Sequence, residues 1–122
     1  MAEPLMPHEY VLLTPRLIGL REVAHAVAAA EPSLAYRMDA GGMQIVLLDG
    51  DATVLTIVHP VPARPVEVRR LLGEDAPPEA EPRWWVDLVA PWEAEERAAR
   101  VVAALTAVSD GTARDLAPGG RG

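Results

Sequence analysis

The middle of the chain holds the pattern that most constrains its fold: two apolar runs joined by a short turn. Residues 43–48 lead into Asp49, Gly50 and Asp51, and residues 53–58 lead away from them. An Asp-Gly pair between two such runs is a strong hairpin signal, because a type I′ turn needs positive φ at both central positions. The alternating run at 34–38 comes just before. The sequence therefore predicts a meander of three consecutive antiparallel strands.

Further elements surround this meander. A β-rich run at 10–14 stops at a proline, and apolar residues at helical spacing follow over 17–30. We expect the proline-rich stretch at 60–65 to be extended and outside the sheet, because proline cannot donate to a strand ladder. The chain then predicts a short helix at 66–72, a strand at 84–89 and a helix at 91–108, while residues 112–116 fit no clear period.

The order is thus β-α-β-β-β-(short α)-β-α, in one domain over residues 1–117 with a flexible tail at 118–122. It predicts an α+β fold, with a single, mostly antiparallel sheet of four to five strands and two long helices on one face. The pattern is similar to that of ferredoxin-like sandwiches, in architecture only. Residues 1–9 are expected to be an irregular lead-in, and 73–82 an acidic, proline-rich surface loop.

The predicted sheet is apolar on both faces. If one face met water, its strands would alternate apolar and polar residues, and the central strands do not. Ile45 and Leu47 point to one face, and Val46 and Leu48 to the other. Two long helices cover one face, so we expect the second to be covered by another copy of the chain or by a partner protein. The alternative is that the short helix and nearby loops are enough.

Composition excludes several classes of function. The 122 residues carry a net charge of −7 and contain no Cys and no Phe, and every basic residue is Arg. Disulfides, Cys-ligated zinc and a Cys nucleophile are therefore impossible, and an acidic chain suits nucleic acid poorly. We expect a cytoplasmic protein with no membrane contact, because no apolar run approaches the length of a membrane span and no signal peptide precedes the domain.

Residues suited to catalysis are few and scattered. His8 and His59 lie at strand ends, and if those strands were antiparallel neighbours the two imidazoles would meet beside Glu9 and could hold a metal. Asp87 lies inside an apolar strand, on the same face as Trp85; a solvent-facing Asp in an edge strand is the simpler interpretation. Strand-end histidines are common and the spacing fits no compact metal motif, so we expect no metal and no cofactor.

The tryptophans are the strongest candidates for a contact surface. Trp84 and Trp85 are adjacent in a strand and so project to opposite faces, while Trp92 lies at a helix start. Trp is enriched at binding hot spots, and it also supplies bulk to a core without Phe. We expect one Trp of the pair to be core, and we place the interface on Trp84, Trp85, Trp92, Val46 and Leu48.

Two hypotheses of different classes follow. The first is a small, non-catalytic interaction or accessory module that associates through an apolar sheet face, as a homodimer or with a partner protein. The second is a small enzyme or small-molecule binder with a pocket between sheet and helix, using Asp87, His59 and His8. The scarcity of catalytic side chains favours the first, and a pocket with convergent polar groups would favour the second.

Overall fold

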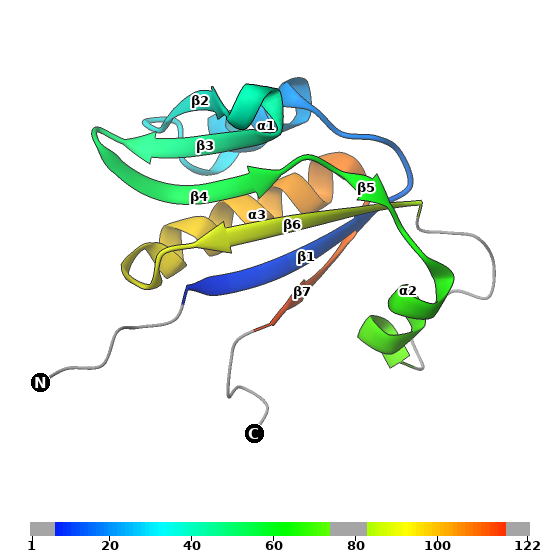
Figure 1. Ribbon diagram of the computed structural model, residues 1–122. Helices are drawn as coiled ribbons and strands as arrows, with labels where there is room; N and C mark the ends of the chain where they lie inside the picture. Colours follow the sequence, from blue (N-terminus) through cyan, green and yellow to red (C-terminus); the bar gives the residue numbers. More distant parts are fainter. Residues whose placement is uncertain (1–6, 74–82, 117–122) are drawn as a thin grey trace, which may run out of the picture.

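The computed structural model describes residues 7–73 and 83–116, which form one α+β unit built on a single sheet (Figure 1). The sheet has seven strands in the order β2-β3-β4-β6-β1-β7, with β5 also paired to β6, and every neighbouring pair is antiparallel. The strands are β1 (His8–Thr14), β2 (Ala35–Asp39), β3 (Gln44–Asp49), β4 (Ala52–Val58), β5 (Val61–Pro62), β6 (Trp84–Ala90) and β7 (Thr112–Asp115).

The α+β fold and the antiparallel sheet are confirmed, and the meander is present as β2, β3 and β4. The turn between β3 and β4 differs in detail from the prediction. Its central residues are Gly50 and Asp51, because Asp49 pairs with Ala52. Of these two, only Gly50 has a positive φ, of 62°. One positive φ at the first central position is the type II′ pattern, so the turn is not type I′.

The prediction of four to five strands is too low, and the ferredoxin-like order is not confirmed. Two short strands were missed. β7 comes from the segment that showed no period, and it pairs with β1 at the sheet edge. β5 contains Pro62, which was expected to lie outside the sheet; it pairs with β6, and the Ala63 N–H donates to the Arg83 carbonyl at 2.9 Å. A proline is tolerated here because no described strand pairs with the other side of β5.

Two long helices cover one face of the sheet (Figure 1). They are α1 (Leu20–Ala30) and α3 (Glu95–Ser109), and a short 3-10 turn, η3 (Trp92–Ala94), precedes α3. Their buried sides pack with the strand residues that point the same way, including Leu12, Leu47 and Leu88. This main core contains most of the largest side chains that are fully buried, with Leu13 the exception among the leucines. We call this side of the sheet the helix face.

The opposite, outer face is covered in part by the short helix α2 (Pro65–Leu72). Its Val68 and Leu72 pack with Val11 and Leu13 of β1 to form a second, smaller core, and Trp85 packs against it. The short helix therefore covers the β1 and β6 part of this face. Figure 1 shows no helix of the described residues in front of β2, β3 and β4.

None of the helices within 7–73 and 83–116 is long and apolar enough to cross a membrane. The predicted tail at 118–122, most of the lead-in at 1–9 and most of the acidic loop at 73–82 lie outside the described residues. The lead-in prediction is wrong at its end, because His8 and Glu9 already belong to β1.

Candidate functional site

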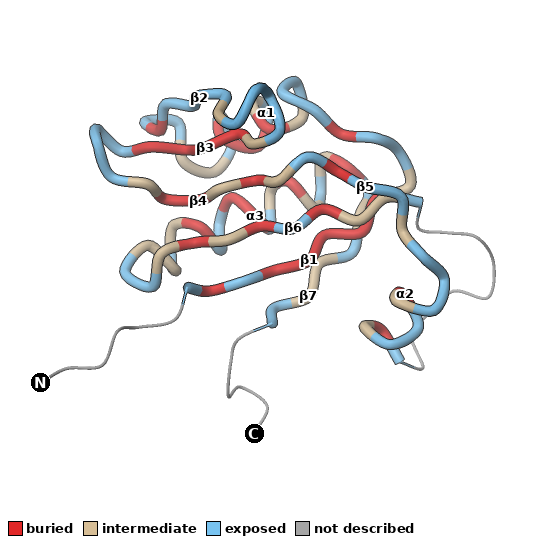
Figure 2. The backbone as a smooth tube through the Cα atoms, viewed as in Figure 1, coloured by how far each residue is buried: buried red, intermediate tan, exposed pale blue. Residues whose placement is uncertain are grey.

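One edge of the sheet is formed by β2, and it is open along the part of the chain that the structure describes. β2 pairs with β3 on one side and with no described strand on the other. Four of its five residues are exposed, whereas the strands in the middle of the sheet are largely buried (Figure 2). An edge of this kind presents backbone N–H and C=O groups to which another extended chain can pair.

The two faces of β2 differ in chemistry. Tyr36 and Met38 lie opposite Leu47 and Ile45 of β3, and so share the helix face. Met38 is 51% exposed, which is unusual for a large apolar side chain beside a main core. The apolar side of the edge therefore reaches solvent without a covering element.

A pocket of about 190 Å³ opens beside Met38, between α1 and the ends of β2, β3 and β4. Its walls are almost wholly apolar: Ile18, Leu20, Val23, Met38, Met43, Ile45, Ile57, Val58 and Pro60, with Gly19, Gly42, Gln44 and His59. Two backbone features hold the rim in place. The Gly19 N–H donates to Glu22 Oε1 at 2.8 Å and starts α1, and the His59 N–H donates to the Met43 carbonyl at 2.8 Å.

Exposed large apolar side chains gather around this edge. Among the nine in the described residues, five belong to two neighbouring segments, namely Leu17, Leu20, Tyr36, Met38 and Met43. Leu20, Met38 and Met43 line the pocket, and Tyr36 shares the face of β2 that carries Met38. We call these four residues, together with the pocket, the β2-end surface. Single exposed apolar residues are ordinary on a protein surface, but a cluster beside a pocket marks a binding surface.

On the outer face of the same strand, a charged pair alternates with these apolar residues. Arg37 donates to Asp39 through two hydrogen bonds, Nε to Oδ1 at 2.7 Å and Nη2 to Oδ2 at 3.0 Å. The guanidinium holds the pKa of the Asp39 carboxyl below its ordinary value, and the carboxylate raises the pKa of Arg37. β2 is thus apolar on one side and carries both signs of charge on the other.

The predicted interface residues do not form one surface. Val46 and Leu48 point to the outer face as predicted, but they are only 4% and 9% exposed. Trp84 and Trp85 are both half-buried, and Trp85 packs against the second core. Trp92 is exposed at the start of η3, with its ring 6.1 Å from that of His8.

The predicted polar-site residues are also separated. β1 and β4 are not neighbours, because β6 lies between them, and so they run parallel. His8 begins β1 level with Ala90, whereas His59 follows β4 beyond the level of Leu88. The geometry that would bring the two imidazoles together is absent, and His59 instead lines the pocket at the β2 end.

The buried ring of His8 lies between two exposed carboxylates near the opposite edge of the sheet. Its Nε2 lies 2.6 Å from Asp115 Oδ1, and its Nδ1 lies 3.6 Å from Glu95 Oε2. The ring is 3% exposed and lies 4.9 Å from that of Tyr10. Burial, with the nearby carboxylates of Asp115 and Glu95, raises the pKa of Tyr10 to about 12. A substrate would have little access to an imidazole placed in this way, so the cluster suits a structural role.

Asp87 lies on the outer face, in a hollow of about 450 Å³ that Val61, Pro62, Arg64, Glu67 and Trp85 also line. Trp85 Nε1 donates to Asp87 Oδ1 at 3.0 Å, so the two residues share a face as predicted. The interpretation of an edge strand is wrong, because β6 pairs on both sides. Asp87 is nevertheless exposed, because it lies in this hollow beside α2 and not under the helix.

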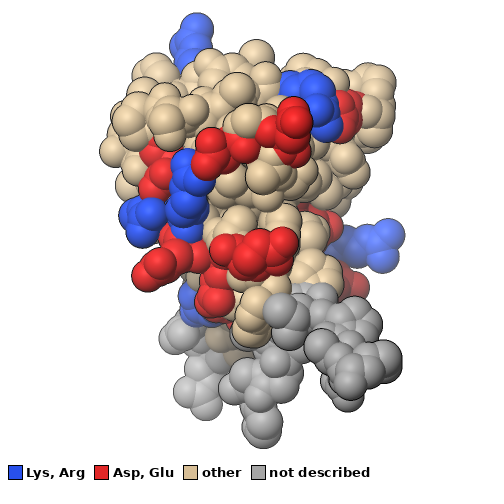
Figure 3. All heavy atoms as spheres, turned by 90° about the vertical axis from the view of Figure 1, so that its left-hand side faces the viewer, with Lys and Arg blue, Asp and Glu red and all other residues tan. Residues whose placement is uncertain are grey.

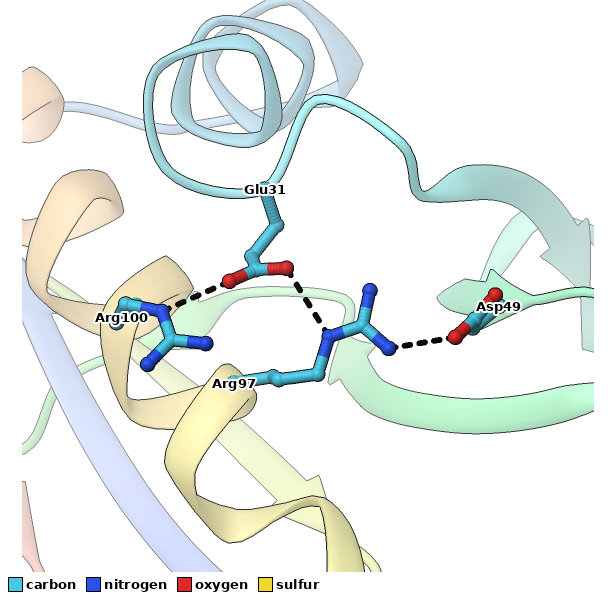
Figure 4. A network of polar contacts seen from close by, with 4 residues as sticks. All are labelled: Glu31, Asp49, Arg97 and Arg100. Atoms are coloured by element: carbon cyan, nitrogen blue, oxygen red, sulfur yellow. Dashed lines mark hydrogen bonds and ion pairs between the residues drawn. The ribbon is translucent and has the colours of Figure 1, made fainter.

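A network of ion pairs joins the two halves of the helix layer (Figure 4). Glu31, at the end of α1, accepts hydrogen bonds from Arg97 Nε at 3.0 Å and Arg100 Nε at 2.7 Å, both from α3. Arg97 Nη1 also reaches Asp49 Oδ2 of the β3–β4 turn at 2.6 Å. Arg100 and Arg97 hold the pKa of Glu31 below its ordinary value. Side chains of both signs lie next to one another at this end of the molecule, which fits a structural network (Figure 3).

The described residues contain no group of three His, Cys, Asp or Glu side chains arranged to hold a metal ion. The β2-end surface was missed from the sequence. In the sequence, Met38 and Met43 look like ordinary strand residues. Their exposure depends on where the sheet ends, which the sequence does not show. The available signal was the alternation of 34–38, in which a charged residue separates two large apolar ones.

Comparisons of this chain with known protein families, with curated proteins and with solved structures find no match.

Proposed function

We propose that this protein is a small, non-catalytic interaction module that binds another polypeptide through the β2-end surface. One observation carries the proposal: exposed Met38 and Met43 line a pocket at the end of β2, and no described strand pairs with the outer edge of β2, which also exposes Tyr36. An extended partner segment can add to such an edge by backbone hydrogen bonds, while pockets for alternate side chains give specificity.

The energetics favour this edge over the outer face as the main contact. Burying apolar surface contributes roughly 25 cal/mol per Å², so a contact gains most where large apolar side chains are exposed. Val46 and Leu48, the outer-face residues of the first hypothesis, have little surface left to cover. Trp85 stays a candidate for a secondary contact, because it is half-buried and lines a hollow.

Methionine is well suited to such a surface. Its unbranched, polarisable side chain adapts to different partners, and it is over-used at promiscuous binding sites. The pocket also has few polar groups, Gln44 and His59 among its lining residues, and it contains no acid. These features support binding of an apolar side chain more than an acid–base reaction.

A site-directed photo-cross-link tests this proposal without knowledge of the partner. The photoreactive residue p-benzoylphenylalanine is placed at Met38, and at Val66 of α2 as a control with similar exposure. We expect cross-linked protein adducts from position 38 in the expressing cell, and few from position 66. Equal yields at the two positions, or none at position 38, would overturn the proposal.

A further inference from the structure

The alternation of apolar and charged residues along β2 favours one kind of partner strand. We propose that a second copy of this chain pairs with β2, so that two sheets join edge to edge in antiparallel fashion around a two-fold axis. This inference rests on the proposed function, because it uses the same edge, and it names the occupant. A two-fold axis gives a closed, isologous contact, the commonest arrangement among soluble homo-oligomers.

Strand geometry limits how two copies of β2 can face each other. Residues directly opposite in an antiparallel pair point to the same face of the sheet. Tyr36 and Met38 point to the helix face, and Arg37 and Asp39 to the outer face. The two-fold axis must therefore lie midway between the two copies of one residue, so that this residue faces itself. Any other register would place Tyr36 opposite a charged residue that points to the other face of the sheet.

Three registers keep at least three residues of each strand paired, with the axis on Tyr36, Arg37 or Met38. An axis on Arg37 places the two guanidinium groups directly opposite, which is destabilising. An axis on Tyr36 places Arg37 opposite Ala35 and leaves Asp39 beyond the partner's strand. An axis on Met38 places each Arg37 opposite Asp39 of the partner subunit, so that two ion pairs form across the contact.

The apolar face favours the same register. With the axis on Met38, the two Met38 side chains face each other at the mouths of the two pockets. Tyr36 of the partner subunit then lies past the end of β2, toward the turn η1 (Ala40–Gly42), whose last residue lines the pocket. A single register therefore pairs the charges of one face and covers the exposed apolar residues of the other.

Charge reversal tests the contact. Arg37→Asp and Asp39→Arg each place two like-charge pairs across the proposed axis, so we expect each variant alone to raise the dimer dissociation constant by about tenfold or more. In an equimolar mixture of the two variants, every facing pair of a mixed dimer joins an acid to an arginine. Sedimentation velocity over a wide concentration range should then show the dimer restored.

Arg70→Asp on α2 is the matched control, since it makes the same change in net charge at an exposed arginine that belongs to an ion pair. It should leave the dimer unchanged. A wild-type chain that stays monomeric at every concentration overturns the inference, as does a mixture that shows no gain over the single variants.

Single cysteine substitutions test the strand register directly. The chain has no cysteine of its own, so any disulfide must join the introduced residues. Directly opposite residues bring their Cβ atoms close to the roughly 3.5–4.5 Å that a disulfide needs. Under mild oxidation we expect Met38→Cys to form a disulfide dimer, and Tyr36→Cys and Arg37→Cys to form little. A dimer that cross-links best at position 36 or 37 refutes the Met38 register.

Failure of this inference and failure of the proposed function give different results. If the photo-cross-linker at position 38 captures a protein of another mass while the pure chain stays monomeric, the interaction function stands and the second copy is excluded. If position 38 captures nothing, both are overturned.

Discussion

The two edges of the sheet are built in opposite ways. At one edge, β7 is short and polar, and it contacts both β1 and α3. The Leu116 N–H donates to the Glu9 carbonyl at 2.8 Å just beyond it, and Asp115 Oδ1 lies 2.6 Å from Nε2 of the buried His8 ring. At the other edge, β2 has its main contacts with β3 and η1 (Ala40–Gly42), and it leaves Tyr36 and Met38 in solvent.

The two edges thus differ in how far contacts within the chain protect them from solvent. Proteins usually protect an edge strand by making it short, charged or covered. β7 meets this expectation through its length, its polar residues and its contacts with α3. β2 has one charged pair, but its other face is apolar and adjoins a pocket. No described strand pairs with the outer side of either β7 or β2. We call the β7 edge, protected by its polar residues and by α3, the closed edge, and the β2 edge, which leaves apolar side chains in solvent, the open edge.

The substitution expected to change the unfolding free energy most is Gly111→Ala, at the turn from α3 into β7. A Cβ at this position would lie 2.6 Å from the Leu13 carbonyl oxygen and 2.9 Å from Leu12 Cδ1. Overpacking of this kind costs typically 1–3 kcal/mol, and contact with backbone leaves little room to adjust, so we expect a loss of about 3 kcal/mol. Urea unfolding followed by circular dichroism measures the change.

Gly19→Ala, beside the pocket at the β2 end, is the matched control. A Cβ there meets no heavy atom within 4 Å, and the residue has an extended φ of −149°. Its effect should stay below about 1 kcal/mol, because it alters only the first residue of the helix cap. If Gly111→Ala were as mild as Gly19→Ala, the β7 edge would not be closely packed.

The role of Gly111 illustrates how much of this fold the sequence could predict. The sequence predicts that the last helix ends at residue 108, shortly before this glycine, and α3 ends at Ser109. The residue with the left-handed backbone is Asp110, with a φ of 57°, and Gly111 is required by the close approach of β1. Local patterns thus predict an element's end well, but not the long-range contact that makes the residue necessary.

The second prediction concerns Tyr10, in the His8 cluster at the closed edge. Its pKa is about 12 in the folded protein and about 10 when exposed. Between these pH values the unfolded chain loses the phenolic proton while the folded chain keeps it, so stability is complete below pH 10 and falls as pH rises toward 12. The loss reached by pH 12 should be about 2 kcal/mol. It stays below two full pKa units at about 1.36 kcal/mol each, because the folded tyrosine is itself half ionised at its pKa.

Tyr10→Phe separates this effect from general alkaline denaturation. The variant keeps the ring and has no group to ionise, so its unfolding free energy should change less between pH 10 and 12 than that of the wild type. If the unfolding free energies of the two proteins fell equally between pH 10 and 12, burial of the Tyr10 hydroxyl at the closed edge would be refuted.

The candidate site was harder to predict than the fold, for a physical reason. Helices and strands follow from local periodicity, and the meander, α1 and α3 were placed to within a few residues. The acids beside His8 come from α3 and β7, far away in sequence, and Glu9 was the only acid nearby along the chain. The exposure of Met38 likewise depends on which end of the meander joins the rest of the sheet: β4 pairs with β6, which leaves β2 at the edge.

The smallest expected effect belongs to Met38→Thr at the open edge. Threonine has a high strand propensity, and the side chain it replaces is half exposed, so the unfolding free energy of the monomer should change by less than about 0.5 kcal/mol. Urea unfolding at a dilution where the chain is monomeric measures it. A loss of unfolding free energy comparable to that of Gly111→Ala would mean that Met38 contributes to the chain's own core. Both edges would then stabilise the single chain. A small loss in stability, together with a large loss in association, would instead show that the β2 edge contributes little to the stability of the single chain and is available to a partner.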